Sequence, residues 1–66
     1  MDTVDTLTML RALYPRIKDF GVHDNGSAWV RLRSGAPDLF LTNDMLQYTI
    51  EQLLKKVKAH DDKFSH

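Results

Sequence analysis

Hydrophobic residues near the start of the chain recur every three or four positions, which is the spacing of one face of an α-helix. Asp2 or Thr3 can cap this segment, and Asp5 lies in the first turn, where the helix dipole favours a carboxylate. Pro15 lacks a backbone donor and disfavours helical geometry at the residue before it, so we predict a helix over residues 3–14. Its apolar stripe consists of Leu7, Leu10, Leu13 and Tyr14.

Apolar and polar positions alternate through much of residues 17–42, which is the period of a half-buried strand. The first interruption of this alternation is Asp24–Gly26, which has the composition of a three-residue hairpin loop with glycine in the left-handed third position. Such a loop sets Val22 opposite Ala28 and also sets Phe20 opposite Val30. The segment before the loop could instead form a helical turn after Pro15.

The second break is Ser34–Pro37, and a proline at this point suits the start of an edge strand. A four-residue loop sets Leu32 opposite Leu39 and sets Val30 opposite Leu41. The two turns agree on one apolar face, which favours a three-stranded antiparallel meander with strands over residues 17–23, 28–33 and 38–42. This face contains Phe20, Val22, Ala28, Val30, Leu32, Leu39 and Leu41.

Residues 43–61 have the periodicity of a second helix, with Thr42 or Asn43 as its cap and Asp44 in its first turn. Charged and polar residues follow, and we expect 62–66 to be a frayed tail. The apolar stripe runs through Leu46, Ile50, Leu53, Leu54, Val57, His60 and Phe64.

These elements predict an α+β fold of order α-β-β-β-α, in which both helices pack on one face of the sheet. The chain has 66 residues, so residues 1–66 form a single domain. A domain of this size buries a small core, and without cysteine it has neither disulfides nor thiolate metal sites. Small domains of this kind are commonly stabilised by self-association, so we expect a homodimer.

Nine Lys and Arg residues balance nine Asp and Glu residues, which argues against a dedicated nucleic-acid coat. The apolar runs are too short to span a membrane, and the acidic start of the chain lacks the basic region of a signal peptide. The cytoplasm is therefore the expected compartment. No motif indicates a cofactor.

The face of the sheet away from the helices holds the residues that we expect to bind a partner. Trp29, Arg31 and Arg33 alternate outward on the central strand, and the expected register places Phe40 opposite Arg31 and Asp38 opposite Arg33. Tryptophan and arginine are enriched at binding hot spots. The predicted protein-binding residues are Trp29, Arg31, Arg33, Phe40 and Tyr48.

Interpretations without a binding role have about equal weight, because a single sequence seldom decides which face of a strand is buried. Trp29 and Phe40 could shield each other while Arg31 stacks on a ring, or the faces could be exchanged so that both aromatics enter the core. Tyr48 is expected on the far side of the second helix, and a solvated tyrosine is the preferred interpretation. The helix stripe that ends at Phe64 could pack against a second copy.

Catalysis and metal binding find little support in the residues. No glutamate or histidine has a catalytic spacing, and a domain this small can hardly form both a pocket and a core, so we expect a non-enzymatic protein. His60, Asp61, Asp62 and His66 could be drawn as metal ligands, but their spacing matches no known site. Surface histidines are the preferred interpretation. The lysines of the second helix are expected to be solvated and to complement its dipole.

Two functions follow as hypotheses. The first is a protein-binding module that modulates or inhibits a larger protein, the kind of accessory protein often found in phages and mobile elements. The alternative is a nucleic-acid-binding module in which bases stack on Trp29 and Phe40 beside Arg31 and Arg33. A structural subunit of a larger assembly is a third option.

The predicted element order resembles that of the double-stranded-RNA-binding domain. That resemblance implies phosphate contacts from the start of the last helix. The corresponding residues here, Asn43–Gln47, contain no lysine and one aspartate. The expected protein partner is therefore preferred over a nucleic acid.

Overall fold

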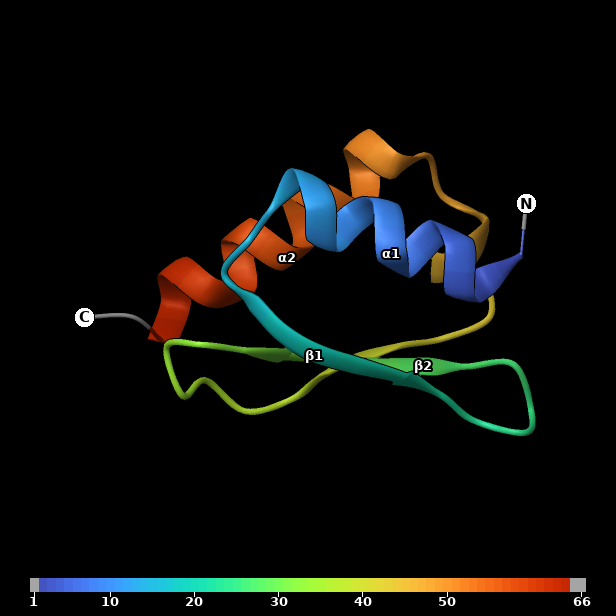
Figure 1. The fold of residues 1–66 in the computed structure, drawn as a ribbon, viewed down its shortest axis with the longest axis horizontal. Helices are drawn as coiled ribbons and strands as arrows, with labels where there is room; N and C mark the ends of the chain where they lie inside the picture. The colour runs from blue at the N-terminus through green and yellow to red at the C-terminus, as the bar shows by residue number, and fades with distance from the viewer. Residues whose placement is uncertain (1, 65–66) are drawn as a thin grey trace.

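Two helices cover one face of a three-stranded antiparallel sheet in the computed structural model, which describes residues 2–64. The elements follow one another as α1, β1, β2, β3 and α2, with the strands side by side in chain order. Figure 1 shows α1 and α2 together above the sheet, while below it, within residues 2–64, no helix lies and the loop between β2 and β3 descends at the left. The predicted α+β fold and its element order are confirmed.

Helix α1 spans Thr3–Leu13, and the carboxylate of Asp2 caps it by accepting the backbone N–H of Val4 at 3.4 Å. It ends where the N–H of Tyr14 bonds the carbonyl of Leu10, immediately before Pro15. The buried stripe is narrower than predicted. Leu7 and Leu10 are fully buried and Tyr14 is half-buried, but Leu13 is 54% exposed because it lies on the flank of the helix.

Strands β1, Ile17–Val22, and β2, Ala28–Leu32, form the predicted hairpin in the predicted register, with Val22 opposite Ala28. Gly26 has φ 91°, the left-handed conformation that the loop requires. The register shifts by one residue between Ile17 and Asp19. This β-bulge brings Ile17 onto the core face although its spacing from Phe20 is odd, and the sequence pattern missed it.

Strand β3, Leu39–Leu41, corrects the second predicted register by two residues. Leu39 lies opposite Val30 and Leu41 lies opposite Ala28, so residues 33–38 form a longer loop than the expected four-residue turn. Within this loop, Gly35 has φ 83° and Asp38 binds Arg31. A slip of two residues preserves which side chains face the core, because the side-chain period of a strand is two.

The predicted helix over 43–61 is interrupted near its start. The hydroxyl of Thr42 accepts the N–H of Met45 at 3.3 Å and begins only the short 3₁₀ helix η1, Met45–Gln47. Helix α2 then spans Ile50–Phe64, and Thr49 and Gln52 bond each other's backbone N–H groups at its start. This capping box sets the beginning of the helix.

Helix α2 also ends later than predicted, because residues 62–64 of the expected frayed tail are helical. The rest of that tail, 65–66, lies outside the described residues. Across residues 2–64, no helix combines the length and the apolar character that a membrane span requires. The buried hydrophobic core comprises Leu7, Leu10, Ile17, Ala28, Val30, Leu32, Ala36, Leu41, Leu53 and Val57.

Candidate functional site

The central strand of the sheet alternates as expected between the two faces. Ala28 and Val30 are fully buried beneath the helices, while Trp29 between them is half-buried and Arg31 is exposed. The outward direction of Trp29 is therefore confirmed, and the alternative in which it enters the core is wrong. Alternation on the pleated strand produces this result, because Leu32 is also buried at the next inward position.

The indole of Trp29 lies against the neighbouring strand rather than standing free in solvent. Gly21 is its partner on β1, and a Cβ atom at Gly21 would clash with the indole Nε1. The guanidinium carbon of Arg31 lies 5.1 Å from the centre of the indole ring system. The absence of a side chain at Gly21 makes room for the ring, and Arg31 adds a cation–π contact.

Arg31 forms a two-point ion pair with Asp38 on the exposed face of the sheet. Its Nε donates to one carboxylate oxygen at 3.1 Å and its Nη2 donates to the other at 3.2 Å. The hydrogen bond from Arg31 holds the pKa of Asp38 below its ordinary value, although partial burial opposes this. The predicted pairing of Asp38 with Arg33 is wrong, because the longer loop moves Asp38 two residues along β2.

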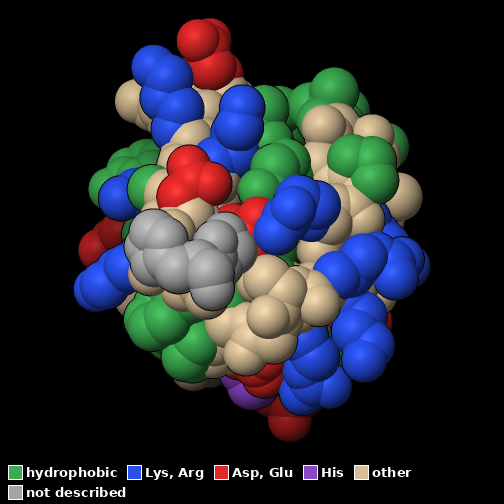
Figure 2. Space-filling model, turned by 90° about the vertical axis from the view of Figure 1, so that its left-hand side faces the viewer, with side chains coloured by type: hydrophobic (Ala, Val, Ile, Leu, Met, Phe, Trp, Pro, Cys, Tyr) green, Lys and Arg blue, Asp and Glu red, His purple; other side chains and the backbone are tan. Residues whose placement is uncertain are grey.

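Arg33 lies at the far end of the sheet, away from the aromatic residues. Its Nε donates to the carbonyl of Pro15 at 3.1 Å, and its backbone N–H bonds the carbonyl of Arg16. Figure 2 looks onto this end of the molecule, where Lys and Arg side chains lie around the surface and several Asp and Glu side chains lie among them. The structure therefore separates Arg33 from the rest of the predicted site.

Phe40 is the most exposed aromatic residue among those predicted to bind a partner, at 53%. It lies opposite Trp29, not opposite Arg31 as expected, because of the shift in register. Its ring centre is 5.8 Å from that of His23, with the planes tilted by 31°. His23 was not predicted to take part, and the three-residue hairpin loop that follows it was the signal available in the sequence.

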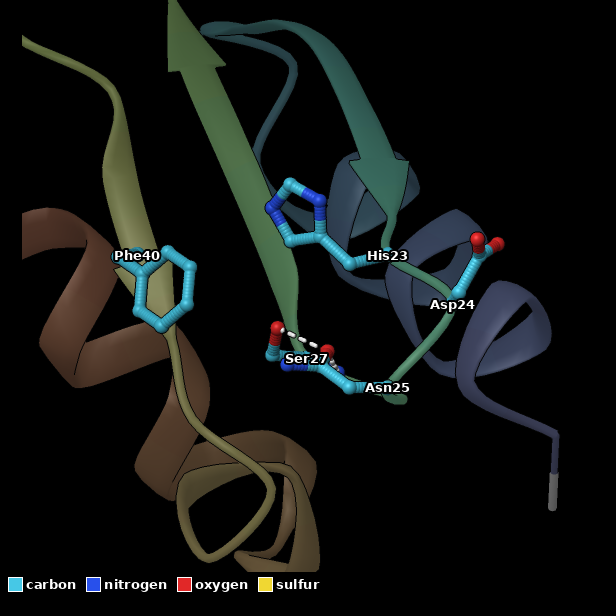
Figure 3. A pocket seen from close by; sticks show the side chains of 5 residues that line it. All are labelled: His23, Asp24, Asn25, Ser27 and Phe40. Carbon is cyan, nitrogen blue, oxygen red and sulfur yellow. Dashed lines mark hydrogen bonds between the residues drawn. The ribbon is translucent and has the colours of Figure 1, made fainter.

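His23 and Phe40 flank an open depression of about 450 Å³ beside the first hairpin loop. Figure 3 shows the two rings on either side of Ser27, while the side chain of Asp24 is turned outward. Ser27 is only 4% exposed, and its hydroxyl donates to the side-chain oxygen of Asn25 at 2.7 Å. The depression therefore has aromatic walls and a polar floor whose hydrogen bonds are already made.

Tyr48 does not join this face. It follows η1 and precedes α2, so its predicted position within the second helix is wrong. Lys56 lies 5.5 Å from the centre of its ring. In Figure 1 the orange segment that contains Tyr48 runs along the helix layer, on the opposite side of the molecule from the open sheet face. The capping box of α2 begins at Thr49, so Tyr48 lies outside the helix.

A buried carboxylate that sequence reasoning missed lies where α2 meets the end of α1. Asp61 is 1% exposed, and it accepts the hydroxyl of Tyr14 at 2.5 Å and Nε of Arg16 at 2.6 Å. The hydrogen bond from Tyr14 lowers the pKa of Asp61 most, with Ser34 and Arg16 adding to this, while burial opposes it. Within residues 2–64, the buried hydroxyl of Ser34 makes no well-formed hydrogen bond.

The same contacts change the acidity of Tyr14. Burial and the hydrogen bond to Asp61 together raise the pKa of Tyr14 to about 12. Asp61 lies four residues after the buried Val57 and continues the inward face of α2. That spacing from Val57 was the signal available in the sequence.

Two of the candidate metal ligands near the end of α2, His60 and Asp61, have other partners. His60 is half-buried, with Nε2 lying 2.6 Å from the carbonyl oxygen of Pro37, and Asp61 is bound as described. His66 lies outside the described residues. In the part of the chain from 2 to 64, no group of three or more His, Cys, Asp or Glu residues is placed to hold a metal.

Comparisons with protein-family models, with curated proteins and with solved structures each give no match for this chain.

Proposed function

We propose that this protein is a non-enzymatic protein-binding module that modulates or inhibits a larger protein through the open face of its sheet. The observation that carries the proposal is the exposed ring of Phe40, which lies on a rigid sheet beside His23 and the depression above Ser27. Aromatic rings beside a hollow are typical anchor points of protein interfaces. Trp29 supports them, since it lies opposite Phe40 and is fixed by its own contacts.

The charge pattern of the face favours a protein over a nucleic acid. The β-bulge leaves both Lys18 and Asp19 exposed on β1 at the position of Arg31, and Asp38 binds Arg31 from the other side. Arg31 therefore lies between two carboxylates, Asp19 and Asp38. Affinity for a nucleic acid comes largely from cations that neutralise phosphates, and Arg31, the cation beside Trp29, is already matched by carboxylates.

Base stacking on Trp29, the alternative expected from the sequence, is also disfavoured. The indole contacts the backbone at Gly21 and the guanidinium of Arg31. Arg33, the other arginine in that hypothesis, bonds Pro15 at the end of the sheet. Phe40 alone offers an accessible ring for stacking among these residues.

The absence of catalysis is part of the proposal and rests on the depression. Ser27 and His23 both line it, and a serine activated by histidine would donate its hydroxyl proton to the imidazole. Ser27 instead donates to Asn25 at 2.7 Å. A binding role suits this arrangement better than nucleophilic catalysis does.

Phe40→Ala tests the proposal, with Phe64→Ala as its matched control. Both rings are exposed to a similar extent, but Phe64 lies on the last turn of α2 beside His60, whereas Phe40 lies on β3. Proteins captured from the native host by the wild type should be identified, purified and titrated against all three chains. Loss of an anchor ring should weaken binding by at least about tenfold in Phe40→Ala alone.

Equal weakening by both substitutions, or by neither, would contradict the assignment of the sheet face. Single-stranded DNA and RNA should be titrated in parallel at two salt concentrations. Salt-sensitive binding that Phe40→Ala abolishes would favour the nucleic-acid alternative.

A further inference from the structure

The charges of this neutral chain are segregated along its sequence in a regular way. Three segments, 2–10, 20–30 and 41–50, contain no Lys or Arg and hold four aspartates. The remaining segments hold all nine Lys and Arg residues and five acidic residues, a formal surplus of four positive charges. The four aspartates are Asp2, Asp5, Asp24 and Asp44.

The fold gathers these segments at opposite ends of the molecule. In Figure 1 the start of α1, the β1–β2 turn and the segment after β3 meet at the right-hand end, whereas the α1–β1 turn, the β2–β3 loop and the end of α2 meet at the left. Figure 2 looks onto the left-hand end and shows its Lys and Arg side chains. The two ends are separated along the longest dimension of the molecule, which is 33 Å between Cα atoms.

Only part of this polarity belongs to the strands and their loops, because Lys55, Lys56, Lys58 and Lys63 lie on α2. At the basic end, Lys18, Arg31 and Arg33 exceed Asp19 and Asp38 by one charge, whereas Asp24 and Asp44 lie at the other end, so the open sheet face is complementary to itself. When two copies meet face to face about a two-fold axis perpendicular to the long axis, the acidic end of each lies on the basic end of the other. A two-fold axis parallel to the long axis would instead bring like charges together, which costs free energy. A two-fold pairing is also closed, so it ends at two copies and does not build a fibre.

The residues nearest the sheet face at each end can be named from their strands. Asp24 lies in the β1–β2 turn, and Asp44 follows β3 with no hydrogen bond from its side chain to the start of η1. At the other end, Lys18 is exposed on β1 and Arg33 follows β2. Phe40 and Trp29 lie on the strands between these ends.

The size of the face sets the expected strength of such a pair. The sheet face is bounded by the longest and shortest dimensions of the molecule, 33 and 18 Å. Its footprint is therefore at most roughly 600 Å² per copy, which places a pair near the lower limit for specific interfaces. We expect a dissociation constant on the order of micromolar and a clear dependence on salt.

We infer that the open sheet face binds a second copy of this chain in an antiparallel, two-fold arrangement selected by the segregated charges. This inference rests on the proposed function, since it names one protein partner for the same face. A larger protein that binds this face would compete with the second copy.

A charge exchange between the two ends tests the arrangement. One variant carries Asp24→Lys and Asp44→Lys, which reverses the charges nearest the sheet face at the acidic end, and the other carries Lys18→Glu and Arg33→Glu, which reverses those nearest the sheet face at the basic end. Each variant alone should pair at least about tenfold more weakly than the wild type, because like charges then meet. An equimolar mixture should form a one-to-one pair again. Sedimentation velocity at low salt measures all three, with circular dichroism to confirm that each chain is folded.

Lys55→Glu is the control, because it changes the net charge by the same amount per residue on α2, which lies in the helix layer. It should pair as the wild type does. A wild type that stays monomeric at about 100 µM in low salt would overturn the inference, and so would a mixture that fails to pair.

The two proposals can fail separately. If Phe40→Ala loses a captured partner protein while the wild type is a monomer, protein binding stands and self-pairing is wrong. If the wild type pairs but neither charge reversal nor Phe40→Ala weakens the pair, then the copies meet elsewhere and the sheet-face arrangement is wrong.

Discussion

Two clusters in this molecule join an arginine, an aspartate and an aromatic ring, yet they lie in opposite environments. In the helix-side cluster the carboxylate is 1% exposed and its partners are 45 and 47 residues away in the sequence. In the sheet-face cluster the carboxylate and the guanidinium are 41% and 50% exposed and only seven residues apart. The helix-side cluster is Tyr14, Arg16 and Asp61, and the sheet-face cluster is Trp29, Arg31 and Asp38.

Residue types alone therefore do not indicate whether a cluster stabilises the fold or is available for binding. A buried carboxylate that loses its donors has no water to replace them, so the helix-side cluster should contribute strongly to stability. An exposed ion pair exchanges one set of polar contacts for another, so the sheet-face cluster should contribute little. The second cluster is thus free to serve recognition, because changing it leaves the fold intact.

Asp61→Ala should have the largest effect. It removes the acceptor for Tyr14 and Arg16 and leaves a small cavity beneath the end of α2, so we expect a loss of about 3 kcal/mol in the free energy of unfolding. Urea denaturation monitored by circular dichroism measures this. Asp62→Ala, at an exposed neighbouring position, should stay within about 0.5 kcal/mol of the wild type. Similar losses in both variants would mean that Asp61 has no special part in the fold.

Tyr14→Phe should cost about 1.5 kcal/mol, because the buried Asp61 loses one hydrogen bond while the ring is retained. This tyrosine also predicts a pH dependence. Its pKa is raised by folding from 10.0 to about 12, so its contribution is complete below pH 10.0 and is lost as the pH rises toward 12.

The urea midpoint of the wild type should therefore fall between about pH 10 and about pH 12, and it should fall less in Tyr14→Phe. An identical alkaline decline in the two chains would assign the effect to other groups.

Gly21→Ala tests the contact between the indole of Trp29 and β1 on the sheet face. The added methyl group must displace the indole of Trp29, but the indole borders solvent and can move, so the cost should be about 1 kcal/mol or less. The chain has one tryptophan, so its fluorescence reports the displacement directly. We expect a shifted emission maximum with nearly unchanged stability. An unchanged emission spectrum would mean that the indole does not rest on β1.

Arg31→Ala should have the smallest effect on stability, less than about 0.5 kcal/mol, because the pair with Asp38 is half-exposed. Urea denaturation at low and high salt measures this change in the free energy of unfolding, and Lys18→Ala serves as a neighbouring control. A loss above about 1.5 kcal/mol would show that the sheet-face cluster helps to hold the fold, and the contrast between the clusters would then disappear.

Local chemistry accounts for the parts of the fold that the sequence predicted correctly. The glycine at position 26 permits the left-handed residue that a three-residue hairpin loop needs, and the register of β1 and β2 follows from it. The ending of α1 before Pro15 is equally local. The outward direction of Trp29 follows from strand alternation together with the burial of Val30.

The errors have long-range or competing causes. The register of β3 brings Asp38 to Arg31, and no turn motif encodes that contact. The start of α2 was misplaced because two threonines can cap a helix, and only the capping box at Thr49 does so for α2. Arg33 was assigned to the site by alternation, but its bond to Pro15 holds it at the end of the sheet.

The sequence by itself determined the order of the elements, the first hairpin and the two faces of the sheet, because these depend on periodicity and on residues adjacent in the chain. Only the tertiary structure decided that Phe40 lies beside His23, that Asp61 is buried against Tyr14, and that the charges separate toward opposite ends. Each of these features joins segments distant in the sequence, and their meeting depends on how the helices pack on the sheet.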